Sequence, residues 1–133
     1  MRIGSLDHLV LTVTDVDAAV TFYEKLGMSR EVFDGSRIAL RFGAQKLNPH
    51  PAGAEIAPHA RRPTPGSADL CFLVDGRLEA VLAELEVAGI PVELGPVGRT
   101  GAQGPIRSAY VRDPDANLVE LSEQEDKHAD LQK

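Results

Sequence analysis

The feature of this sequence that most constrains its fold is an internal repeat. When His8 is aligned with Asp69, Val13 falls on Val74, and after a shift of one residue Leu26-Gly27-Met28 falls on Ala88-Gly89-Ile90. A repeat of only two copies indicates a paired module rather than a solenoid. At 133 residues the chain has the usual length of one domain. We therefore expect one domain built from two similar halves.

The first half, about residues 4–50, is predicted to have the order βαβββ. Leu6–Val13 is β-branched and alternating, which predicts a strand, and Ala18–Leu26 has helical spacing after the capping pair Thr14-Asp15. Turn residues then separate three short predicted strands, which are Ser29–Phe33, Arg37–Phe42 and Gln45–His50.

The second half, about residues 67–122, repeats that order after a linker at residues 51–66 that is rich in Pro, Gly and Ala. Ser67–Val74 is predicted to be a strand and Leu78–Ala88 a helix that ends before Gly89 and Pro91. Three further strands are predicted at Pro91–Pro96, Ile106–Val111 and Asn117–Ser122. The polar segment 123–133 is predicted to be a tail, so the domain covers residues 4–122.

Strand alternation predicts which side chains share a face. His8 lies on the face opposite to Leu9 and Leu11, which we expect under the helix, and Asp69 takes the equivalent place in the second copy. Glu120 is a carboxylate in the middle of an apolar strand, where burial without a partner is costly. If the two halves curve toward each other, these polar side chains converge in one cavity.

Composition excludes several classes of function. The net charge is −6 and the basic residues are scattered, so no nucleic-acid partner is expected. No apolar run is long enough to span a bilayer and the first residues lack the order of a signal peptide, which predicts a cytoplasmic protein without a membrane partner. Cys71 is the only cysteine, so a metal would be held by His, Asp, Glu or Asn.

Three segments together resemble the vicinal-oxygen-chelate (glyoxalase/bleomycin resistance protein/extradiol dioxygenase) superfamily. They are residues 6–11 (LDHLVL), 22–28 (FYEKLGM) and 113–121 (DPDANLVEL). Residues 42–48, 63–71 and 95–102 further resemble its glyoxalase-domain-containing branch, which is described as virulence-associated or dioxygenase-related. The resemblance implies an α+β fold in which paired βαβββ modules form an eight-stranded, cup-like mixed sheet.

The resemblance also implies one divalent metal ion per site, which would be Fe, Mn, Ni, Co or Zn. Carried over by position, the metal ligands are His8, Asp69 and Glu120. Asp69 departs from the family pattern, where His is more common. His50 shares the face of Asn48, the position equivalent to Glu120 in the first half, and is the alternative third ligand.

A metal with open positions binds a small molecule through two neighbouring oxygens, which supports a lyase, isomerase or dioxygenase. We expect Glu120, Tyr110 and Arg99 to be catalytic, with Arg99 on a lid formed by the glycine-rich segment 95–104. Arg41, Asn48, Gln103 and Ser108 are expected to surround the substrate.

A second class of function remains open, because members of this superfamily also sequester antibiotics or other drugs without catalysis. A drug-binding cup needs aromatic walls, whereas aromatic residues make up 5% of this chain and Trp is absent, which favours the enzyme. Exposed sheet edges predict a homodimer. Each site is then built within one chain or across the dimer, and both possibilities stay open.

Overall fold

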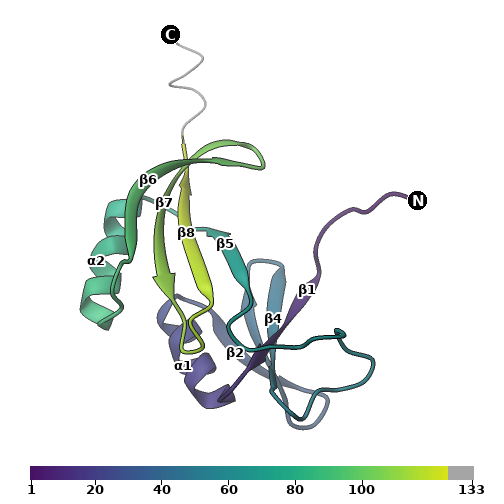
Figure 1. The fold of residues 1–133 in the computed structure, drawn as a ribbon. Coiled ribbons are helices and arrows are strands. Elements are labelled where there is room, and N and C mark those ends of the chain that lie inside the picture. Colours follow the sequence, from purple (N-terminus) through teal and green to yellow (C-terminus); the bar gives the residue numbers. More distant parts are fainter. Residues whose placement is uncertain (126–133) are drawn as a thin grey trace. The chain divides into compact units, whose positions relative to one another are not determined.

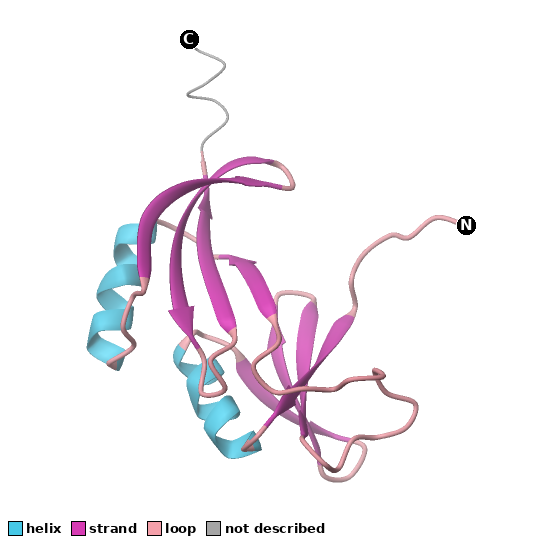
Figure 2. Ribbon diagram, in the orientation of Figure 1, coloured by secondary structure: helices cyan, strands magenta, loops and turns pink. Residues whose placement is uncertain are grey.

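The computed structural model describes residues 1–125, and the rest of the predicted tail, residues 126–133, lies outside the described part. Figures 1 and 2 show the helices and strands of the described chain. Their order is β1 (His8–Val13), α1 (Val16–Lys25), β2 (Ser29–Phe33), β3 (Arg37–Phe42), β4 (Gln45–Pro51), β5 (Asp69–Leu73), α2 (Leu78–Ala88), β6 (Leu94–Gly101), β7 (Gly104–Arg112) and β8 (Leu118–Gln124). The predicted α+β class and the paired βαβββ order are confirmed, and the strands are divided between two four-stranded mixed sheets.

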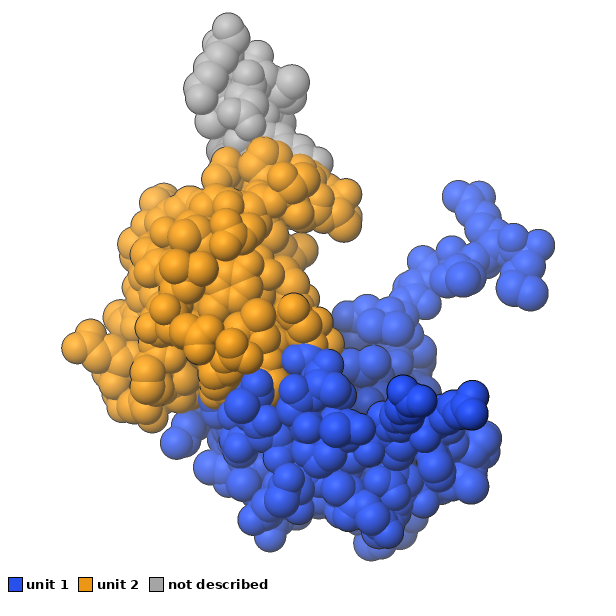
Figure 3. All heavy atoms as spheres, viewed as in Figure 1, with its two compact units in different colours: residues 1–68, 113–116 blue, residues 69–112, 117–133 orange. Residues whose placement is uncertain are grey.

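The chain forms two compact units, which Figure 3 shows in blue and orange. The first unit contains residues 1–68 and 113–116, and the second contains residues 69–112 and 117–125 of the described chain. The helices are too short and too polar to include a membrane-spanning segment within the described residues.

The first unit is a four-stranded sheet with strand order β1-β4-β3-β2. β1 is parallel to β4, whereas β2, β3 and β4 are antiparallel neighbours. Helix α1 begins after Asp15, whose side chain accepts a hydrogen bond from the Ala18 amide, and it packs on one face of the sheet. The core between helix and sheet consists of buried apolar side chains, which include Leu11, Val13, Val20, Tyr23, Leu40 and Leu47.

The second unit has the same topology, with strand order β5-β8-β7-β6 and β5 parallel to β8. Helix α2 packs against β7 and β8 on one face of this sheet. Its core includes Leu78, Leu85, Ala109, Val111, Val119 and Leu121. In both units the first strand therefore lies at a sheet edge and is paired in parallel with the last strand.

The predicted bounds of the strand at Pro91–Pro96 were wrong, because β6 begins at Leu94 and runs to Gly101. This strand pairs with β7 along most of its length, with an irregularity between Leu94 and Val97. Ladder pairing satisfies the backbone hydrogen-bonding groups and thereby overcomes the low strand propensity of a glycine-rich segment. The last strand also runs two residues beyond its predicted end, to Gln124.

The turn between β7 and β8 belongs to the first unit. Asp113 accepts a hydrogen bond of 2.7 Å from the buried Tyr23 hydroxyl, and Asp115 accepts from the Thr14 amide at 3.1 Å. Gly66 packs closely against this turn, since a Cβ at its position would lie 2.7 Å from the Asp115 carbonyl oxygen, and its φ is +81°. Both features require glycine at residue 66.

Candidate functional site

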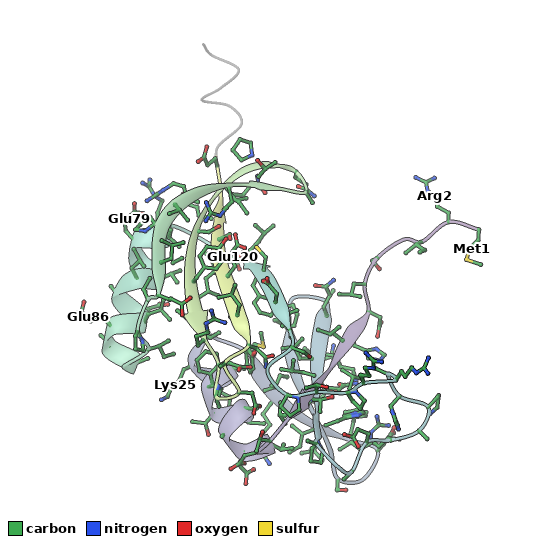
Figure 4. All side chains as sticks on the ribbon, viewed as in Figure 1. Met1, Arg2, Lys25, Glu79, Glu86 and Glu120 are labelled. Atoms are coloured by element: carbon green, nitrogen blue, oxygen red, sulfur yellow. The ribbon has the colours of Figure 1, made fainter. Side chains whose placement is uncertain are left out.

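The sheet of the second unit has a helix-covered face and a second face, which we call the carboxylate face. Strand register places a group of polar or reactive side chains on it, which includes Asp69, Cys71, Ser108, Tyr110, Glu120 and Ser122. Cys71 and Tyr110 are the two residues opposite Glu120 on its neighbouring strands. Figure 4 shows Glu120 on β8, on the side of this sheet away from α2.

Glu120 is half-buried and is held by a serine hydroxyl. Ser108 Oγ donates to Glu120 Oε2 at 2.6 Å, and Ser122 Oγ lies 3.4 Å from the same oxygen. The two serines are fully buried and their hydroxyl oxygens lie 2.7 Å apart. A carboxylate that accepts hydrogen bonds from ordered hydroxyls keeps a fixed position, which is the requirement for a metal ligand or a general base.

Cys71 lies at the edge of this group, with its Sγ 3.3 Å from Ser122 Oγ. Burial raises the pKa of the Cys71 thiol, and the negative charge of Glu120 raises it further. The thiol is therefore protonated at neutral pH, which argues against a role as a thiolate nucleophile.

Arg99 and Tyr110 form a second group on the same sheet. Arg99 Nε donates to the Tyr110 hydroxyl at 2.9 Å, and the guanidinium carbon lies 5.5 Å from the centre of the Tyr110 ring. Arg99 sits within strand β6, opposite Ile106, so the segment 95–104 is part of a strand hairpin and not the predicted loop. Gln103 lies in the exposed turn between β6 and β7.

The first unit also has a face away from its helix, which we call the basic face. His8 is the first residue of β1 and is exposed, and its Nδ1 lies 2.8 Å from Asp7 Oδ2. A carboxylate at Nδ1 favours the proton on that nitrogen and leaves the lone pair on Nε2. Arg41 lies on the same face, where its Nε donates to Glu31 at 2.6 Å.

Asn48 and His50 lie on the same face as His8, since β1 and β4 pair in parallel with His8 opposite Lys46. Both side chains are buried. Asn48 Oδ1 and His50 Nε2 have no hydrogen-bond partner among the described residues. Burial lowers the pKa of His50, and the charge of Arg37 lowers it further, so the imidazole is neutral at neutral pH.

The predicted site residues thus divide between the units. The second unit brings Asp69, Ser108, Tyr110 and Glu120 to one face, and the first unit brings His8, Arg41, Asn48 and His50 to another. Within residues 1–125 no three His, Cys, Asp or Glu side chains gather closely enough to form a metal-binding group.

Sequence reasoning missed three side chains that contact the predicted site residues. Ser122 hydrogen-bonds to Ser108, and alternation from Glu120 was the signal for it. Asp7 contacts His8 directly and precedes it in the chain. Arg37 faces His50 from the neighbouring strand, and only the strand register reveals this proximity.

Comparison with known proteins agrees with this architecture. The model of the glyoxalase/bleomycin resistance protein/dioxygenase superfamily matches residues 5–121. The chain is 52% identical to virulence protein STM3117 of Salmonella typhimurium over 92% of this chain and 86% of that protein. It is 51% identical to glyoxalase domain-containing protein RDO1 of Mycosarcoma maydis, over 95% of this chain and 72% of that protein.

Solved structures with this fold include both enzymes and binding proteins. The crystal structure of STM3117 superposes with a TM-score of 0.92, covering 94% of this chain and 100% of that one. A lactoylglutathione lyase from Agrobacterium tumefaciens is 26% identical with a TM-score of 0.69, covering 92% of this chain and 95% of the lyase. The antibiotic-binding protein TnmS3 from Streptomyces shares the fold at 22% identity and a TM-score of 0.73, covering 94% and 99%. This chain belongs to the glyoxalase/bleomycin resistance protein/dioxygenase superfamily.

Proposed function

We propose that the protein is a divalent-metal-dependent enzyme that acts on a small molecule bound through two neighbouring oxygens. The observation that supports this most is the Glu120 carboxylate, which Ser108 holds at 2.6 Å and which lies between Val119 and Leu121 on β8. Burial of a carboxylate costs desolvation free energy, so a sheet with a purely structural role gains little stability from one.

The donor chemistry of the chain fits such an ion. His8 has a carboxylate neighbour at Nδ1, which makes Nε2 the nitrogen that would bind metal. Glu120 and Asp69 add two carboxylates from adjacent strands of one sheet. One imidazole and two carboxylates suit Mn, Fe(II), Co, Ni or Zn, and three protein ligands leave positions open for the substrate.

We propose Asp69 rather than His50 as the third ligand. Asp69 shares the carboxylate face with Glu120, where negative charge favours a cation. His50 is buried beside Arg37, whose charge already opposes a proton on the imidazole and would oppose a divalent cation more strongly.

The bound metal would act as a Lewis acid that polarises a carbonyl or lowers the pKa of a hydroxyl. The protein's own contribution comes from groups around Glu120. Tyr110 lies opposite Glu120 in the strand register and is positioned to hold or donate a proton at its hydroxyl, while Arg99 stabilises negative charge there. Such proton transfer supports a lyase or isomerase, and bound O2 would give a dioxygenase.

Residues on both faces are proposed to orient the substrate. Ser108 positions Glu120, and Asn48 offers an unsatisfied carbonyl oxygen. Arg41 already pairs with Glu31, so it would act as an anion ligand only after exchanging that partner. Gln103 is exposed in a hairpin turn and would contact the outer part of a substrate.

Elemental analysis of protein purified without added metal or chelator tests the proposal. We expect about one ion per chain in the wild type and a loss of most of it in His8→Ala and in Glu120→Ala. Glu93→Gln is the matched control, because Glu93 is an exposed carboxylate in the same unit that pairs with Arg112. Wild-type protein that carries and takes up no metal would overturn the proposal.

That negative result would favour the alternative, a drug-sequestering protein without catalysis. The fold shared with the antibiotic-binding protein TnmS3 supports this second candidate. Calorimetric titration of metal-free protein with aromatic antibiotics separates the two, because a sequestering protein binds its drug without an ion.

We further propose a homodimer. β1 and β5 are edge strands of their sheets, and an exposed edge is a ready pairing surface for a second chain. Sedimentation equilibrium measures the assembly state directly. Refolding His8→Ala and Glu120→Ala chains together then tests whether each ion takes ligands from both chains. If it does, some mixed dimers contain a site with both His8 and Glu120, and metal binding returns. If each site lies within one chain, no such site forms and metal binding does not return.

A further inference from the structure

A cavity lies within the first unit. It has a volume of about 300 Å³ and is lined by the end of β4, the start of β3, the start of α1 and residues 51–56. This volume is at the lower end of the range for small-molecule binding sites. Every lining residue belongs to the same compact unit, so the cavity is a property of that unit alone.

Two nitrogen atoms of residues that line the cavity are buried without a hydrogen-bond partner among the described residues. They are Arg37 Nε and His50 Nε2. The antiparallel register pairs Leu40 with Leu47, and its continuation brings Arg37 opposite His50. His50 is 8% exposed. Arg37 Nε is always a donor, and His50 Nε2 is a donor in the tautomer that carries its proton there. A buried donor without an acceptor costs about 1–3 kcal/mol, so in that tautomer both nitrogens favour an acceptor that reaches them.

The guanidinium of Arg37 is held in place by its neighbours. Its carbon lies 4.9 Å from the centre of the Phe33 ring, and Nη1 forms a loose pair with Asp34 at 3.6 Å. Neither contact uses Nε, which remains available as a donor. Glu55 is near His50, but its carboxylate accepts a hydrogen bond from the Gly53 amide at 2.9 Å and so has its own partner.

The charge at this position selects the kind of ligand. A permanent guanidinium charge and an imidazole N–H attract an acceptor that carries negative charge, and they repel a cation. Apolar side chains line the rest of the cavity, including Val16, Ile38, Pro49 and Ile56. The complementary molecule therefore has a compact anionic head and a hydrocarbon body.

We propose that this cavity binds a small organic carboxylate, whose oxygens accept hydrogen bonds from Arg37 Nε and His50 Nε2 and whose hydrocarbon part contacts Val16, Ile38 and Ile56. His50 then serves as an anion ligand and not as a metal ligand. Both nitrogens are already shielded from water, so a small rotation that exposes them to a carboxylate requires little further desolvation. The inference does not depend on the proposed metal chemistry.

Calorimetric titration with benzoate tests the proposal on the full-length protein as purified. We expect saturable binding that is at least about tenfold weaker for benzamide, the neutral analogue, since it removes the charge-assisted hydrogen bonds. Acetate, which has the same head and almost no body, should also bind more weakly, because it loses the apolar contacts. Absence of saturable benzoate binding, or equal affinity for benzamide, overturns the proposal.

Two variants assign the binding to these residues. Arg37→Gln and His50→Phe should each weaken benzoate binding by about tenfold or more. Arg30→Gln is the matched control, because Arg30 is an exposed cation on β2 that lies opposite Leu40, on the other face of the same sheet. Equal weakening by Arg30→Gln would show a general charge effect and would contradict the assignment. Backbone amide NMR spectra confirm that each variant is folded.

Two further measurements separate this cavity from the proposed metal site. Benzoate affinity should stay within about twofold in Glu120→Gln, which leaves the cavity intact. If Glu120→Gln abolishes benzoate binding while Arg37→Gln does not, the carboxylate binds elsewhere and the proposal is wrong. The metal content of His50→Phe should equal that of the wild type, and loss of metal in this variant would identify His50 as a metal ligand and overturn the proposal.

Discussion

The two units have the same topology but different side chains on their helix-free faces. The basic face of the first unit carries His8, Arg37, Arg41 and Lys46, whereas the carboxylate face of the second carries Asp69 and Glu120 with Ser108 and Ser122, together with Arg99 and Arg112. The core positions stay apolar in both units. The two units thus share one topology and an apolar core, and they differ in the polar side chains of their helix-free faces.

The difference between the two faces is clearest at positions that occupy the same place in the strand register of each unit. Asn48 lies opposite Val10 as Glu120 lies opposite Cys71, so the two residues occupy the same place in their units. Asn48 Oδ1 is buried without a hydrogen-bond partner among residues 1–125, whereas Glu120 accepts from Ser108. The second unit supplies hydroxyls to hold a charge, and the first unit leaves a neutral amide.

Replacement of Glu120, the charged residue of the pair formed with Asn48, should have the largest effect on metal affinity. Glu120→Gln keeps the size of the side chain and removes the charge, so we expect metal affinity to fall by about 100-fold or more. Competition with a chelating dye measures it. Asn48→Ala, the equivalent change in the first unit, should alter metal affinity by no more than about threefold. Similar losses in both variants would contradict the division of roles.

Removal of the hydroxyl that holds Glu120 should have the next largest effect. Ser108→Ala is expected to weaken metal binding by about tenfold, because the carboxylate loses its shortest hydrogen bond. Ser29→Ala is the matched change in the first unit, on the same face as Arg41, and should leave the affinity unchanged. The same chelator competition applies, and an unaffected Ser108→Ala protein would exclude Ser108 from positioning the ligand.

A pair of tyrosine variants compares stability between the units. Tyr23→Phe removes a buried hydroxyl that donates to Asp113, so the free energy of unfolding should fall by about 1 kcal/mol in urea denaturation. Tyr110→Phe removes a partly exposed hydroxyl that bonds to Arg99, and its cost should be smaller. The reverse order would show that the Tyr23 hydrogen bond adds little.

The smallest effect is expected at Cys71. Its thiol pKa is raised by burial and by the charge of Glu120, so less thiolate is present at a given pH than for a free cysteine. Glu120→Gln removes the negative charge, lowers this pKa and should speed alkylation about twofold to threefold at pH near 8. The rate is measured on chelator-treated protein, with unfolded protein as the reference. An unchanged rate would place the Glu120 charge too far from the thiol to act.

Much of the fold was predictable because local signals agreed. The range of α2 matched exactly, since Gly89 and Pro91 both mark its end. The error at β6 arose where local and tertiary preferences disagree, because glycine content favours a loop while pairing with β7 favours a strand.

The candidate site was predictable to a more limited extent. Period-two alternation placed Ser108, Tyr110 and Glu120 on one face, and the register agrees. The proximity of Arg37 to His50 was not predictable, since it depends on how β3 and β4 pair. The metal ligand set stays a prediction.

Strand order has one further consequence for how the protein could be re-engineered. Glu120 lies on an inner strand that is fixed on both sides, whereas His8 and Asp69 begin edge strands and are exposed. Substitutions at exposed edge positions disturb few contacts. A library randomised at residues 8 and 69 should therefore remain largely folded, which makes these positions the natural place to select for a new ion while residue 120 is kept constant.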